Sequence, residues 1–62
     1  GAYFNIRVDK NLSGTQVDFY SSDRFIFSAH VGSGGYIRIK KHSEIGKEIL
    51  SSIATKNLRI LV

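Results

Sequence analysis

The sequence contains no cysteine, no membrane-length apolar run and no leader-like segment at its start. Without Cys, the chain forms neither a disulfide framework nor a thiolate metal site, and two histidines cannot close a metal site alone. No apolar run approaches the ~20 residues that a membrane-spanning helix needs, and no signal-peptide pattern is present. We therefore expect a soluble, cytoplasmic protein with no membrane partner, no metal and no cofactor.

Motifs of enzyme active sites are also missing. There is no G-x-S-x-G elbow, no H-E-x-x-H zinc motif and no Walker-type phosphate loop. The five acidic residues are scattered and offer no pair for general acid–base catalysis. His30 falls on the outward phase of a strand, where a solvated or structural histidine is commoner than a catalytic one. The sequence thus predicts a protein that is not an enzyme.

The chain has 62 residues, of which 42% are hydrophobic, and is therefore expected to be a single small domain. A domain of this size lies near the lower limit at which an apolar core can stabilise the fold without disulfides or bound metal ions. Burial of a face against a second copy would add stability, so we expect self-association as a homodimer. The opening Gly1-Ala2 fits either a cloning remnant or the start of an excised domain, and the apolar end at Val62 also fits an excised fragment.

The net charge of +4 is unevenly distributed. Residues 1–23 carry a net charge of −1, whereas residues 24–62 carry seven cations against two acids, a net charge of +5. Concentrated basic charge favours an anionic partner such as DNA, RNA or an acidic protein. The alternative is an ordinary solubilising surface.

Alternating apolar and polar side chains predict about five short strands, separated by turn-forming residues. One helix is expected near the C-terminus, with Ser43 as its N-cap and Ile45, Ile49, Leu50 and Ile53 facing the core. Gly46 costs this helix on the order of 1 kcal/mol relative to Ala, which a close approach to the sheet would explain. The predicted fold class is α+β, with a mostly antiparallel sheet in the order βββ-β-α-β. The expected strands are 3–8, 15–20, 25–31, 36–40 and 58–62.

The aromatic residues sort by strand face. All four Phe fall on the inward phase, and all three Tyr fall on the outward phase. Outward Tyr residues are often only good cross-strand neighbours. Alternatively, Tyr3 and Tyr36 form a platform on which nucleic-acid bases stack between cations. That interpretation requires the strands 3–8 and 36–40 to be neighbours in one sheet.

The stretch from Gly32 to His42 carries the strongest functional signal. A glycine turn leads into a strand with one apolar face, and the opposite face carries Tyr36, Arg38 and Lys40. Cations at the end of a strand and near a helix N-terminus can bind a sugar–phosphate backbone. The alternative, and the commoner case, is that such a cluster is simply a solvated group of surface charges. The glycine turn itself either presents N–H groups to a phosphate or serves as a hairpin turn with positive φ. The candidate nucleic-acid-binding residues are Arg38, Lys40, Lys41, Tyr36, Arg7, Arg24, Tyr3 and His42.

From Val31 onward, the chain resembles the swapped-hairpin DNA-binding domain of the AbrB and MazE type. Val31-Gly32-Ser33 matches the family's turn, and Ile37-Arg38-Ile39 falls at the family's spacing, with Lys40 in place of the hallmark Pro. Residues 43–53 match the helix and residues 58–62 the closing strand. The resemblance implies an intertwined homodimer that contacts DNA through basic side chains, with Arg38 as the best single candidate.

The sequence therefore predicts a nucleic-acid-binding module, with DNA a better candidate than RNA, that acts as a homodimer in transcription regulation. Phosphate contacts would dominate its affinity and make it sensitive to salt. The alternative is a protein-interaction or assembly module, or a small inhibitor, that uses a sheet edge or the face bearing Ile26.

Overall fold

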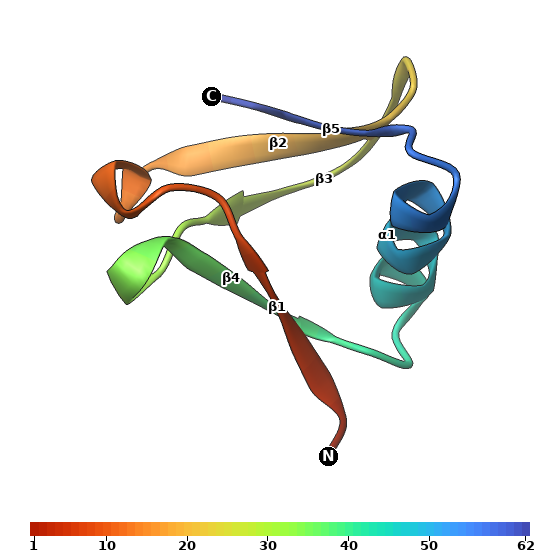
Figure 1. The fold of residues 1–62 in the computed structure, drawn as a ribbon, viewed down its shortest axis with the longest axis horizontal. Helices are drawn as coiled ribbons and strands as arrows, with labels where there is room; N and C mark the ends of the chain where they lie inside the picture. Colours follow the sequence, from red (N-terminus) through yellow and green to blue (C-terminus); the bar gives the residue numbers. More distant parts are fainter.

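The computed structural model describes all residues from Gly1 to Val62. Five strands, one α-helix and two 3₁₀ turns follow one another along the chain, and the helix stands against one end of the strands (Figure 1). The predicted α+β class and element order are confirmed. The elements are β1 (Tyr3–Arg7), η1 (Lys10–Leu12), β2 (Gln16–Ser21), β3 (Arg24–His30), η2 (Ser33–Gly35), β4 (Tyr36–Lys40), α1 (Glu44–Ala54) and β5 (Leu58–Leu61).

The strands form two antiparallel sheets. One is the pair β1–β4, and the other has the order β3–β2–β5. The connection between β2 and β3 is a hairpin, as expected, but the glycine turn is not, because β3 and β4 belong to different sheets. The first two strands do not pair with each other either, since β1 pairs with β4. Residues 32–35 thus carry the chain from one sheet into the other.

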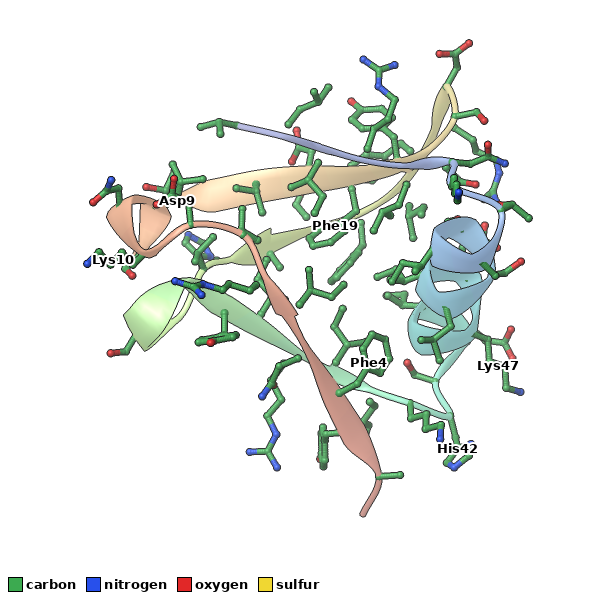
Figure 2. The ribbon with its side chains drawn as sticks, in the orientation of Figure 1. Phe4, Asp9, Lys10, Phe19, His42 and Lys47 are labelled. Atoms are coloured by element: carbon green, nitrogen blue, oxygen red, sulfur yellow. The ribbon has the colours of Figure 1, made fainter.

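The core lies where the two sheets and the helix meet. Phe19 and Val17 of β2 and Ile49 of α1 are fully buried. Figure 2 shows Phe19 in the middle of the molecule, where its ring centre lies 4.9 Å from that of Phe27. Burial of such side chains is the main source of stability in a domain this small. Three further buried apolar side chains complete the core: Val31, Ile37 and Ile39.

A β-bulge in β3 changes the face on which its first residues lie. Phe19 pairs with Phe27 but Tyr20 pairs with Phe25, so Ile26 is the extra residue. Because side chains alternate along a strand, the extra residue reverses the phase before it. The expectation that Phe25 points inward is therefore wrong: this ring is 52% exposed and packs edge-to-face on Tyr20. Ile26 is instead half-buried and packs against the core.

The helix begins as predicted, because the Ser43 hydroxyl accepts a hydrogen bond from the Gly46 N–H at 2.9 Å. Gly46 is buried at the predicted close approach, where a Cβ would overlap the carbonyl oxygen of Lys40. The buried face of α1 consists of Gly46, Ile49 and Ser52. Small residues bring the helix backbone close, and the Ser52 hydroxyl donates a hydrogen bond to the Ser21 hydroxyl at 2.9 Å.

This close approach corrects the predicted helix phase. The expectation that Ile45 and Ile53 face the core is wrong, since they are 37% and 46% exposed. A helix that rests on Gly46 and Ser52 leaves the flanking isoleucines beside the contact rather than in it. After the helix, Lys56 has a left-handed backbone conformation, with φ of 61°.

Candidate nucleic-acid interface

The pairing of β1 with β4 brings together residues that lie 29 to 37 positions apart in the chain, from Arg7 with Tyr36 to Tyr3 with Lys40 (Figure 1). In this register Tyr3 lies opposite Lys40, and Arg7 lies opposite Tyr36. The two strands are therefore neighbours in one sheet, which a shared surface of tyrosines and cations requires. We name the outward side chains of these two strands the β1–β4 face: Tyr3, Asn5, Arg7, Tyr36, Arg38 and Lys40, all of them exposed.

Each tyrosine of the β1–β4 face has an arginine over its ring. The guanidinium carbon of Arg38 lies 4.1 Å from the centre of the Tyr3 ring, and that of Arg7 lies 6.0 Å from the centre of the Tyr36 ring. A cation over an aromatic face restrains both side chains through the ring quadrupole. Tyr3 and Tyr36 remain 44% and 43% exposed, so each ring keeps surface for a planar ligand.

The charge of the β1–β4 face has one sign. Its three cations are Arg7, Arg38 and Lys40, and neither strand carries an acidic residue. The two ion pairs of the molecule, Arg24–Glu48 and Arg59–Asp23, lie elsewhere. The cations of this face are therefore free to bind an anionic partner.

Lys41 and His42 extend this basic surface beyond the end of β4. Both are exposed on the turn that leads to α1, and Figure 2 shows His42 at that end of the molecule. The backbone N–H of Lys41 donates to the carbonyl of Ala2 at 3.0 Å, which holds the turn against the start of β1. His42 and Lys40 also line a hollow there, together with Tyr3.

Arg24 does not belong to this surface. It lies at the start of β3, in the other sheet, and its guanidinium forms an ion pair with Glu48 of α1. Strand pairing separates β3 from β1 and β4, so Arg24 lies apart from the other predicted nucleic-acid-binding residues. Seven of the eight predicted residues remain together around one two-stranded sheet.

The glycine turn makes a close crossing with the loop that follows β1. Gly34 and Gly35 have φ of 83° and 86°, which other residues adopt only with strain. A Cβ on Gly35 would lie 2.5 Å from the carbonyl carbon of Asp9, so the two connecting loops meet there. The N–H groups of Gly32 and Gly35 donate within the loop, to the carbonyls of Tyr36 at 2.8 Å and Gly32 at 3.0 Å.

Asn5 is a member of the face that was not among the predicted nucleic-acid-binding residues. It lies opposite Arg38 in the strand register and is exposed between Tyr3 and Arg7. The alternation of residues 3–8 already placed it on the same side as these two. Its amide can both donate and accept hydrogen bonds, which suits contacts to base edges or sugars.

The remaining chemistry of the molecule is sparse. No group of three or more His, Cys, Asp or Glu residues is arranged to hold a metal ion. The structure also contains no helix with the length and apolar character that crossing a bilayer demands. Asp18, on β2, accepts a hydrogen bond from the Ser28 hydroxyl at 2.5 Å, an exposed cross-strand contact.

Comparison with known proteins finds no matching family model, no matching curated protein and no matching solved structure.

Proposed function

We propose that this protein is a small, non-enzymatic nucleic-acid-binding module whose interface is the β1–β4 face. The observation that carries the proposal is the strand register, which puts two tyrosines and three unpaired cations on one exposed surface. The cations would neutralise phosphates and dominate the affinity. The tyrosines would stack on bases or pack on sugars.

The shape of the interface is compatible with more than one form of nucleic acid. A two-stranded β-ribbon fits the major groove of duplex DNA, and exposed aromatic residues between cations suit a single strand. The resemblance to the AbrB and MazE type favours DNA, a homodimer and a role in transcription regulation. Such a role would also place the protein in the cytoplasm.

The proposal is tested by fluorescence-anisotropy titration of labelled single-stranded and double-stranded DNA and RNA. With three phosphate contacts, affinity should fall roughly 20- to 40-fold between about 50 and 200 mM salt. Replacing Arg38 and Lys40 by Ala should weaken binding at the lower salt and flatten this dependence, because two of the three cations are gone. Absence of binding to all four probes at the lower salt would overturn the proposal.

The matched control removes two cations from another surface. Lys47 is exposed on α1, and Lys56 follows the helix with positive φ. Lys47→Ala combined with Lys56→Asn lowers the net charge by the same amount, and Asn tolerates the left-handed conformation. This control should retain most of the affinity. Equal losses in both double variants would show that net charge, and not the β1–β4 face, drives binding.

A protein-interaction module is the second candidate, and the exposed aromatic ring of Phe25 favours it. Phe25 and Ile45 line a hollow of about 270 Å³ between β3 and α1. Apolar side chains gathered at one place are typical of protein contacts. This candidate predicts salt-tolerant binding to a protein, lost in Phe25→Asp but kept when Arg38 and Lys40 are replaced by Ala. Ile26 is unsuitable for this test, because it packs against the core.

A further inference from the structure

A hollow of about 370 Å³ lies at one end of the β1–β4 face, between the start of β1 and the turn after β4. Its volume falls within the ~300–1,000 Å³ of typical small-ligand sites. His42, which Figure 2 shows on this turn, forms one wall of the hollow. The residues that line the hollow are Gly1, Ala2, Tyr3, Lys40, His42 and Ser43.

Tyr3 lines this hollow and also contacts Arg38. The guanidinium carbon of Arg38 lies 4.1 Å from the centre of the Tyr3 ring, and Arg38 is not among the residues that line the hollow. The Tyr3 side chain is 44% exposed, so part of it is accessible to a ligand. A tyrosine held in place in this way loses little further rotamer freedom when a base stacks on it.

The polar character of the hollow suits an anion. Lys40 and His42 line it, and no carboxylate does. The Ser43 hydroxyl is already engaged, because it donates to the Lys40 carbonyl at 2.7 Å and accepts from the Gly46 N–H at 2.9 Å. Among the side chains that line the hollow, those of Lys40 and His42 remain available to contact a phosphate.

The other hollow of the molecule has the opposite character. It lies between β3 and α1, and Glu44 and Glu48 line it with the single cation Arg24. Arg24 is paired with Glu48 there. A phosphate would meet net negative charge in that hollow, which selects the hollow beside Tyr3 as the anion site.

We propose that the hollow beside Tyr3 binds one unpaired nucleotide, with its base stacked on the Tyr3 ring and its phosphate held by Lys40 and His42. This inference rests on the proposed function and adds the form of nucleic acid, since a base must leave its duplex to enter the hollow. The protein therefore prefers single strands to duplexes. Arg7 and Tyr36, at the far end of the face, contact the strand farther along its length.

The experiment scans one stable abasic position along a labelled single strand of about four thymidines, a length near the smallest site of single-strand binders that limits shifts of register, with the 62-residue chain tagged at its C-terminus. Loss of one stacked base should lower affinity roughly 5- to 100-fold, and only when the abasic site falls at the nucleotide in the hollow. In Tyr3→Leu this positional effect should vanish while the salt dependence remains. Tyr36→Leu is the matched control, because it removes a tyrosine of the same face outside the hollow.

Three results separate the inference from the proposed function. A positional abasic effect that disappears only in Tyr3→Leu supports both, and His42→Gln should then weaken the intact strand severalfold. Salt-dependent binding in which duplex equals single strand, or in which Tyr3→Leu and Tyr36→Leu behave alike, overturns the nucleotide site alone. No binding to any probe overturns both. A parallel scan with uridine strands shows whether the hollow distinguishes RNA from DNA.

Discussion

Arg38 contacts Tyr3 diagonally across the β1–β4 pair, with its guanidinium carbon 4.1 Å from the centre of the ring. The residue directly opposite Arg38 is Asn5, and the residue directly opposite Tyr3 is Lys40. Diagonal neighbours in an antiparallel pair lie within reach of long and aromatic side chains. The contact therefore ties the two strands of the smaller sheet together through their outward face as well as through their hydrogen bonds.

This contact should be measurable as a coupling energy. A double-mutant cycle with Arg38→Ala and Tyr3→Leu, followed by urea unfolding, should give a coupling of about 0.5–1 kcal/mol, typical of an exposed cation–π pair. The same cycle with Arg7→Ala and Tyr36→Leu is the control. It should give less, because that cation lies 6.0 Å from the ring centre. A larger coupling for Arg7 and Tyr36 would contradict the geometry.

Gly46→Ala should destabilise the protein, although alanine has the higher helix propensity. In an exposed helix, Gly→Ala stabilises by about 1 kcal/mol. At residue 46 a Cβ would overlap the Lys40 carbonyl and lie 3.0 Å from the Lys41 carbonyl oxygen. Gly46→Ala should therefore lower the free energy of unfolding, by about 1–3 kcal/mol as overpacking does. Ser51→Ala, at an exposed position of the same helix, should be neutral or stabilising in the same chemical denaturation.

Gly35 and Gly14 share positive φ but differ in their surroundings. Each has φ near 85°, at 86° and 83°, yet a Cβ on Gly14 meets nothing within 4 Å. Gly14→Ala should lower the free energy of unfolding by only about 1–2 kcal/mol, the cost of placing an L-residue in a left-handed backbone conformation. Gly35→Ala should cost clearly more and broaden the unfolding transition or prevent folding, since the Asp9–Lys10 backbone blocks the Cβ. Equal melting temperatures for the two variants, measured by circular dichroism, would rule out this close crossing.

Self-association should depend on the exposed apolar side chains around the start of β3. Nine of the 62 residues are buried, and Phe25 and Ile45, which line the hollow between β3 and α1, are 52% and 37% exposed. A homodimer that covers these side chains would add to a small core. Sedimentation velocity should detect a dimer at micromolar concentrations and at least a tenfold weaker one in Phe25→Ser. A protein that stays monomeric at about 100 μM, where even weak dimers form, would contradict the expected homodimer.

The sequence by itself determined the local structure. Alternation placed every strand within one or two residues, because a half-buried strand needs a period of two. Ser43 located the helix start because its hydroxyl satisfies a free backbone N–H. Outward placement of Tyr3, Tyr36, Arg38 and Lys40 followed from the same alternation and is confirmed.

Only the tertiary structure decided which of these surfaces meet. The pairing of β1 with β4 joins residues far apart in the chain, and alternation says nothing about partners. It is this pairing that assembles the candidate interface and leaves Arg24 outside it. The bulge at Ile26 and the close approach at Gly46 likewise changed the faces of Phe25, Ile45 and Ile53. In each case the local periodicity shows which side chains share a face. The packing of one backbone against another sets the register and decides which face is buried.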